Sequence, residues 1–303
     1  MISFRYHLVS IIGVFLALAL GIVVGTTALN GPITTDLRKQ VNNLKNDRLA
    51  LANQVKALQS QVGDAGAFAE QFGTQIVQGT LTKKNVLMIG MPGASSSTED
   101  GIEKQITAAG AHLSRLELTS SYVDQRRGSD ITSLATTVHP IGLTYPEVND
   151  PGQLAGALLG YVLLGRGQAT DLSQVLGGFS ELHMLSVGGG GITPTTSVVI
   201  VGSGVLPQGS YAAQMELSFV TALQHAGGNI VVAGNGSSAT EAGLVAGVRN
   251  SSALKSAVTT VDNADAAIGQ VSAVLAISDA LNSSFGHYGT ARGAVALFPN
   301  IGR

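Results

Sequence analysis

The sequence predicts an α/β domain with a mostly parallel sheet, preceded by a single transmembrane helix and a coiled-coil helix. Three observations support this fold class: an unbroken apolar run near the N-terminus, a heptad pattern directly after it, and apolar segments that alternate with helical patterns further on. We therefore divide the chain into a tail (1–7), a transmembrane helix (8–29), a coiled coil (33–62) and a glycine-rich α/β domain (80–303).

The composition excludes several classes of protein. Apolar residues make up 45% of the 303 residues and glycine contributes 39, which is typical of a well-buried fold and not of a disordered chain. The formal net charge is −2, so nucleic acid is not an expected partner. Cysteine is absent, which excludes disulfides, iron–sulfur clusters and thiolate sites for zinc or copper.

The apolar run at residues 8–29 reads LVSIIGVFLALALGIVVGTTAL. As a helix it extends about 33 Å, which is enough to cross the hydrocarbon core of a bilayer. A cleaved signal peptide is the alternative, but the run is longer than a usual signal core and only Arg5 precedes it, so we favour an uncleaved anchor. The basic residues on the two flanks are too evenly balanced to orient the helix.

Small residues recur at every fourth position of this run and form one stripe along the expected helix. Such a stripe lets the backbones of two membrane helices approach closely, although glycine and alanine are common in membrane helices in any case. The stripe consists of Gly13, Ala17, Gly21 and Gly25.

A heptad seam of apolar residues runs through residues 37–62. Valine occupies three of its four a positions, with Arg48 at the fourth, and leucine occupies every d position, a pattern that favours a parallel dimer. We expect a break at Gly31-Pro32 before this helix and a hinge at residues 64–66 after it. The apolar seam residues are Leu37, Val41, Leu44, Leu51, Val55, Leu58 and Val62.

The expected partner of the seam is a second copy of the chain, so that the transmembrane helix and the coiled coil together predict a homodimer. Two alternatives remain at this point. The seam could pack on the chain's own globular domain, or it could dock the helix of another protein.

Apolar segments and helical patterns alternate from residue 83 onward. Continuous apolar strands that alternate with helices predict a parallel sheet covered on both faces, within a single domain. Residues 119–150 are expected to be irregular. The expected strands are 85–91, 112–118, 197–202, 229–234, 257–262 and 293–298. The expected helices are 97–110, 151–165, 171–186, 211–225, 237–247 and 264–283.

A glycine-rich turn between an expected strand and helix fits the pattern G-x-G-x-x-A, with Gly234 and Gly236 as its glycines. Asp262 ends the next expected strand. In a dinucleotide-binding fold this spacing lets helix-terminal amides bind a pyrophosphate and an acid bind a ribose. A tight turn in a glycine-rich chain is the alternative interpretation. Because G-x-S-x-G, H-E-x-x-H and Walker sequences are missing, we do not expect an enzyme.

Soft thioether and imidazole groups are the side chains here that suit Cu(I). The adjacent pair His183-Met184 and the strand residue Met88 are the candidate copper ligands. Met88 and Met91 would point to opposite sides of a strand. The other histidines of the globular part are scattered: His112, His139, His225 and His287.

Three stretches carry a resemblance to a known family: the start MISFRYHLVS, the run FLALALGIVVGTTAL, and the ending FGHYG (285–289) before GAVALF. With the heptad helix and the glycine-rich domain between them, the chain resembles the actinobacterial MctB family over nearly its whole length. This is the mycobacterial copper transport protein B group, whose corynebacterial members are called SteB. No copper-binding residue is carried over by the resemblance.

The resemblance implies two different functions. One is a membrane-associated, pore-forming protein that acts in copper efflux and resistance, with the N-terminus inside and the α/β domain outside the cytoplasm, and with outer-membrane association as an option. The other is an envelope protein that pairs with a SteA-like membrane partner and activates a cell-wall hydrolase in cell division through its coiled coil. Because one span per subunit makes a pore only through oligomerisation, the residues themselves favour an anchored rod and head.

Overall fold

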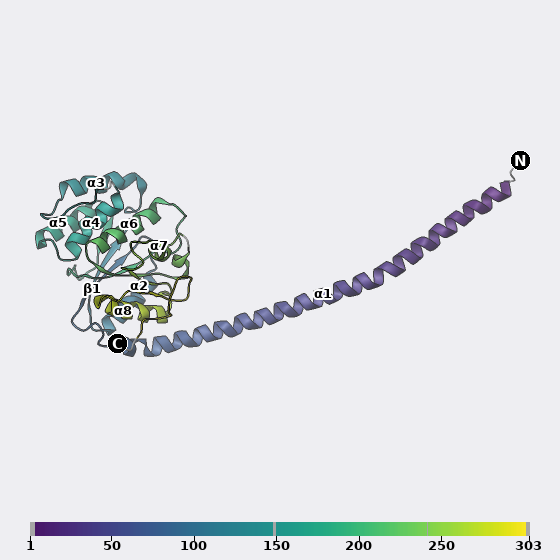
Figure 1. Cartoon of the computed structure of the whole chain (residues 1–303), viewed down its shortest axis with the longest axis horizontal. Helices are drawn as coiled ribbons and strands as arrows, with labels where there is room; N and C mark the ends of the chain where they lie inside the picture. The colour runs from purple at the N-terminus through teal and green to yellow at the C-terminus, as the bar shows by residue number, and fades with distance from the viewer. Residues whose placement is uncertain (1–3, 148–149, 241, 301–303) are drawn as a thin grey trace. The chain divides into compact units, whose positions relative to one another are not determined.

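The computed structural model describes residues 4–147, 150–240 and 242–300, and it separates into two compact units between Gly63 and Asp64. The first unit is formed by the long N-terminal part of helix α1 (Phe4–Val77). The second unit contains the end of α1 and the α/β domain, whose helices cover both faces of a sheet (Figure 1).

Helix α1 is continuous, which corrects two expectations from the sequence. The chain is helical through Gly31-Pro32, where a break was expected, and through residues 64–66, where a hinge was expected. A proline inside a helix removes one hydrogen bond, and here the helix continues past that loss.

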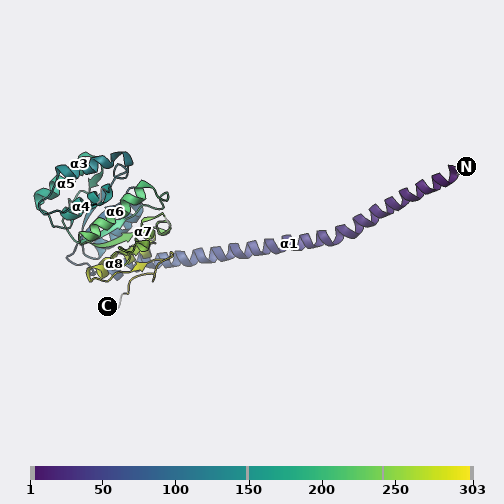
Figure 2. The same cartoon turned by 45° about the horizontal axis from the view of Figure 1, so that its top comes forward.

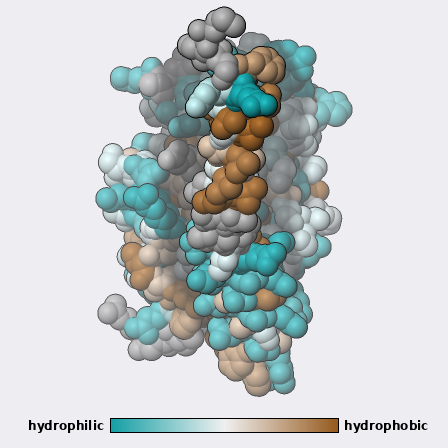
Figure 3. All heavy atoms as spheres, turned by 90° about the vertical axis from the view of Figure 1, so that its right-hand side faces the viewer, coloured by the Kyte–Doolittle hydropathy of each residue, from teal (hydrophilic) through white to brown (hydrophobic). Residues whose placement is uncertain are grey.

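In the described part of the chain, Phe4–Thr26 is the one stretch that is long and apolar enough to cross a membrane. None of it is buried by the rest of the protein. Its hydrophobic side chains lie open along the N-terminal part of α1 in Figure 3. The N-terminal helix therefore has the length and the exposed apolar surface of a membrane anchor.

The heptad seam also lies open on α1. Its seven apolar side chains are between 49% and 71% exposed, from Val55 at the low end to Leu44 and Val62 at the high end. Gly13, Gly21 and Gly25 of the small-residue stripe have no other part of the chain within 4 Å of an added Cβ. The structure thus leaves both expected contact faces uncovered, and the coiled coil stays a prediction.

In the described ranges, seven strands form one sheet in the order β3-β2-β1-β4-β5-β6-β7. Of the neighbouring pairs only β2 and β3 run antiparallel, so the mostly parallel sheet is confirmed. The strands are β1 (Asn85–Gly90), β2 (His112–Leu118), β3 (Leu185–Val187), β4 (Ser197–Val201), β5 (Asn229–Ala233), β6 (Thr259–Val261) and β7 (His287–Tyr288).

The helices make two layers with separate hydrophobic cores. The layer with α3 to α7 covers one face, and α2, α8 and the C-terminal end of α1 cover the other (Figures 1 and 2). The helices are α2 (Ser96–Ala108), α3 (Gly128–Thr137), α4 (Pro151–Leu163), α5 (Ala169–Glu181), α6 (Tyr211–His225), α7 (Leu244–Asn250) and α8 (Ala267–Leu281), with 3-10 turns η1 (Gln125–Arg127) and η2 (Gly236–Ala239).

Four expected elements are corrected by the structure. The segment 293–298 is not a strand: it is largely exposed, and only Ala296 makes an isolated bridge to Tyr288 of β7. The helix expected at 237–247 is instead the short turn η2 followed by α7. The segment 119–150, expected to be irregular, contains α3. The helix expected to reach residue 186 ends at Glu181, and β3 follows.

The strand order changes direction between β1 and β4. From β1 the chain moves to β2 on one side, whereas β4, β5, β6 and β7 extend on the other side. In open α/β sheets the loops at the carboxyl ends of two such strands diverge and leave a crevice, which is the usual place for a functional site. This edge of the sheet is therefore the expected place for a functional site.

Candidate functional site

The loops after β1 and β4 lie next to one another at this edge. Gly93 turns the chain after β1 with a φ of +87°, and a Cβ added there would lie 3.8 Å from the Cβ of Ser203, which follows β4. Two buried glutamates flank the loops. Glu99 comes from the first turn of α2 on one face of the sheet, and Glu216 comes from α6 on the other; they are 3% and 1% exposed.

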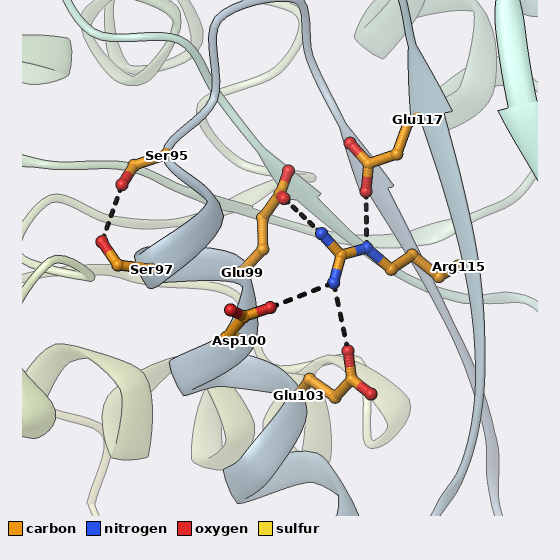
Figure 4. A network of polar contacts seen from close by, with 7 residues as sticks. All are labelled: Ser95, Ser97, Glu99, Asp100, Glu103, Arg115 and Glu117. Carbon is orange, nitrogen blue, oxygen red and sulfur yellow. Dashed lines mark hydrogen bonds and ion pairs between the residues drawn. The ribbon is translucent and has the colours of Figure 1, made fainter. Parts of the chain in front are cut away.

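Arg115 of β2 is surrounded by acidic side chains (Figure 4). Its Nη2 lies 2.6 Å from Glu99 Oε2, and its Nε lies 2.6 Å from Glu117 Oε1. Its Nη1 reaches Asp100 Oδ1 at 3.3 Å and Glu103 Oε2 at 3.2 Å. One guanidinium therefore offsets only part of the negative charge of these four carboxylates.

Local geometry explains why these side chains meet. Arg115 and Glu117 are two residues apart on β2 and so lie on the same face of the sheet, the face that α2 covers. Glu99 and Glu103 are four residues apart on α2 and share one side of that helix. Because Gly90 of β1 pairs with Glu117 of β2, the end of β1 also lies at this cluster.

The other oxygens of the two central glutamates face the backbone of Gly90. A Cβ at Gly90 would overlap both Glu99 Oε1 and Glu117 Oε2, so glycine leaves the space that these oxygens occupy. Glu99 Oε1 is buried and finds no hydrogen-bond partner in the described ranges. Burial, and next the negative charge of Glu117, raise the pKa of Glu99 to about 7, while Arg115 opposes the rise. Two carboxyl groups in this position favour sharing one proton.

Glu216 forms a second buried acid at the same edge. Its Oε1 accepts a hydrogen bond of 2.8 Å from Ser203 Oγ, and its Oε2 is buried without a partner among the described residues. Burial raises the pKa of Glu216 to about 7, although the bond from Ser203 lowers it. Glu99 and Glu216 can thus each gain or lose a proton near neutral pH.

Asp262, one of the residues proposed for nucleotide binding, is engaged inside the protein. Its Oδ1 accepts hydrogen bonds from the backbone N–H groups of Thr290 (2.7 Å) and Ala291 (3.0 Å). Its Oδ2 forms an ion pair of 2.9 Å with Arg249 Nη2. Both carboxylate oxygens of Asp262 therefore hold the turn after β7 in place. The sequence hypothesis had assigned this carboxylate to a ribose instead.

The glycines of the same hypothesis lie in the turn after β5. Gly234 donates its N–H to Val261 of β6, and Gly236 begins η2. The Oδ1 of Asn235 accepts one hydrogen bond from the hydroxyl of Ser237 and one from the N–H of Ser238. These bonds stabilise the turn from within. The structure brings Gly234 and Asp262 to the ends of adjacent strands, where the side chains of Asp262 and Asn235 are engaged with other groups of the protein.

The three candidate copper ligands do not come together. Met88 is buried in the core under α2 and α8, whereas Met184 is buried in the core on the opposite face of the sheet. His183 is exposed, with a φ of +53°. In the ranges that the structure describes, no group of three or more His, Asp or Glu side chains is placed to hold a metal ion.

Sequence analysis did not single out Glu99, Arg115, Glu117 or Glu216 as site residues. One signal was present. The strand HLSRLEL carries two charged residues at alternate positions, whereas a strand covered on both faces is usually apolar throughout. Paired charges on one face of such a strand indicate a buried polar contact.

Comparison with known proteins shows the family of the chain. The model of a family described as copper transport outer membrane protein, MctB, matches residues 1–299. A protein named copper transporter MctB from Mycobacterium tuberculosis is 28% identical over 314 residues, covering 98% of this chain and 99% of the relative. The protein of the same name from Mycobacterium leprae is 29% identical with the same coverage. The chain therefore belongs to the MctB family.

Proposed function

We propose that this chain acts in copper efflux or copper resistance at the cell envelope, as the membrane-anchored subunit of a transport assembly. The observation that carries the proposal is the family match, which extends from the apolar N-terminal helix through the α/β domain. Copper is the cargo in this proposal, and the names of the relatives support that choice.

An assembly is proposed because a single helix cannot enclose a path for an ion. Membrane pores need several helices or a closed barrel, since every backbone polar group must be satisfied within lipid. Two faces of α1 support self-association: the small-residue stripe in the apolar stretch and the open heptad seam at residues 37–62. The proposed unit is a homodimer, from which a larger assembly would be built.

Complementation of a mycobacterial strain that lacks its own MctB relative tests the proposal. The full chain should restore growth in copper and lower the copper content of the cells. A seam variant with Leu44, Leu51 and Leu58 changed to Asp should fail in both measurements. The matched control adds the same charge on the opposite side of the helix, with Asn46, Asn53 and Ser60 changed to Asp, and should complement. Full expression in the membrane without any gain in copper tolerance would contradict the proposal.

The topology in this proposal puts the α/β domain outside the cytoplasm. The chain has no cysteine, so a single Ser60→Cys variant gives one labelling position on an exposed part of α1. A membrane-impermeant maleimide should label it in intact protoplasts as fully as in lysed ones. Labelling only after lysis would place the domain inside.

The open heptad seam favours a second candidate function, that of a scaffold whose coiled coil docks a SteA-like partner and regulates a cell-wall hydrolase. The same variants separate the two functions. If the seam variant keeps copper tolerance but leaves daughter cells attached, the scaffold function replaces transport as the leading proposal.

A further inference from the structure

A cavity of about 400 Å³ lies between α4, α6 and the loop after α3, on the helical layer that includes α3 to α7. It is separate from the acidic cluster around Arg115, which lies on the other face of the sheet. Cavities of this size, lined mainly by apolar and aromatic groups with a few polar ones, are typical of sites for small molecules.

The floor of the cavity is the close contact between α4 and α6. Gly156 of α4 meets Ala222 of α6, where an added Cβ would lie 2.7 Å from the alanine Cβ. One turn further, a Cβ on Gly160 would lie 3.2 Å from the Cβ of Ala226. Because glycine and alanine let the two helices pack closely, the floor of the cavity carries short side chains.

The loop over the cavity is tied down by two tyrosines that line it. The Tyr145 hydroxyl donates to the carbonyl of Ala135 at 2.9 Å, at the end of α3. The Tyr161 hydroxyl donates to the carbonyl of Ile141 at 2.8 Å, within the loop itself. Both rings are thereby held at the wall of the cavity with their hydroxyl groups hydrogen-bonded, and the ring of Tyr145 is also in contact with His139. The parts of the rings that line the cavity offer apolar surface to a ligand.

The lining of the cavity contains a cation and no acidic side chain. Arg166 and His225 contribute to the lining, and none of the lining residues is an Asp or a Glu. Within the described residues, Arg166 forms no ion pair, and its Nη2 lies 2.6 Å from the position of an added Cβ at Gly227, beside the end of α6. Arg166 is an exposed residue at the edge of the cavity, and a guanidinium without an acidic partner there is suited to bind a carboxylate through two parallel hydrogen bonds.

We infer that this cavity binds a small organic carboxylate with an apolar body about the size of one aromatic ring. The carboxylate contacts the Arg166 guanidinium, with His225 beside it, and the apolar body lies on Ala157 and against the rings of Tyr145 and Tyr161. The inference does not depend on the proposed role in copper transport, because it rests on the cavity and not on the family match or on α1.

Fluorine NMR of the full chain in lipid nanodiscs tests this inference, with 4-fluorobenzoate as the probe. The neutral 4-fluorobenzamide has the same shape and reports the contribution of the charge. Two variants remove different parts of the site: Arg166→Gln removes the cation, and Ala157→Leu fills the cavity. Lys104→Gln removes an exposed cation from α2 on the other face of the sheet and serves as the control. Empty nanodiscs measure partition of the probes into lipid.

Saturable broadening of the benzoate signal is the expected result, with binding about tenfold weaker for the benzamide and for the Arg166→Gln variant. Ala157→Leu should abolish binding at an unchanged unfolding temperature, and Lys104→Gln should bind as the unaltered chain does. Equal binding of the two probes, unchanged binding to either pocket variant, or no signal beyond that of empty nanodiscs would each overturn the inference.

Discussion

The α-carbon of Gly289 lies against the carboxylate of Asp262. Gly289 follows β7 with a φ of +126°, and a Cβ at this position would overlap the carboxyl group of Asp262. The same carboxylate accepts hydrogen bonds from the next two backbone N–H groups of the turn and pairs with Arg249. The Tyr288-Gly289 turn carries part of the family resemblance. Its contacts with Asp262 hold the segment after β7 against the end of β6.

Replacement of Gly289 by alanine should destabilise the α/β domain strongly. Both the overlap with Asp262 and the positive φ oppose a side chain, and we expect the free energy of unfolding to fall by at least about 3 kcal/mol. Chemical denaturation followed by near-ultraviolet circular dichroism measures this loss, because five of the six tyrosines lie in the α/β domain. Gly236→Ala is the matched control, since nothing lies within 4 Å of a Cβ added there. Equal stability of the two variants would refute the role given to Gly289.

Glu99 should make the stability of the domain depend on pH between about 4.5 and 7. Its pKa is raised to about 7 in the folded state, chiefly by burial, so the folded chain binds this proton more tightly than the unfolded chain does. The resulting stabilisation is complete below the unfolded pKa and is lost as the pH rises through the folded pKa. Glu216 acts in the same direction, because burial raises its pKa to about 7 as well.

The variant Glu99→Gln tests this dependence. The amide is neutral at every pH, so the variant should be more stable than the unaltered chain at pH 8, and the difference should shrink at pH 5. Unfolding free energies measured across this range give the slope directly. Glu103→Gln removes one charge from the half-exposed side of the same cluster and should leave the slope as it is. A slope that persists unchanged in Glu99→Gln would show that other groups cause it.

Arg115 should stabilise the folded domain by offsetting the repulsion between the carboxylates of the acidic cluster. Its replacement by glutamine leaves Glu99 and Glu117 facing one another without a cation, and we expect a loss of about 2–4 kcal/mol at pH 8. The loss should be smaller at pH 5, where Glu99 is protonated. Arg126→Gln is the control, because Arg126 pairs with Asp124 at a side chain that is 89% exposed, and such pairs contribute little. Similar losses of stability for Arg115→Gln and Arg126→Gln would show that Arg115 does not have this stabilising role.

The main elements of the fold could be predicted because each is encoded locally. β2 and α6 have the expected bounds, since a short leucine-rich run and a capped amphipathic run each specify their structure within a short window. The segment 293–298 shows the limit of this approach. It has the apolar character of a strand, yet Val295 is 76% exposed, because only tertiary structure decides whether a neighbouring strand is present.

The candidate site was less predictable because its properties arise from contacts between distant residues. The spacing placed Gly234 and Asp262 at adjacent strand ends, but it did not show that Arg249 and the turn after β7 occupy the carboxylate. Nor does the sequence near Glu99 show its burial, which depends on Gly90 and on the register of β2. The raised proton affinity of Glu99 follows from that burial, so it can be inferred only from the folded structure.

The heptad seam should pair two copies of the chain in parallel, and the absence of cysteine makes this directly testable. In a parallel dimer the d positions of two copies lie side by side, so a Leu51→Cys variant should form a disulfide-linked dimer under mild oxidation in membranes. Asn53→Cys lies on the opposite side of the helix and should remain monomeric. Cross-linking at Asn53 alone, or at neither position, would reject the parallel seam. Cross-linking at Leu51 that is lost when Leu44 and Leu58 become Asp would show that the apolar seam, and not the membrane helix alone, brings the copies together.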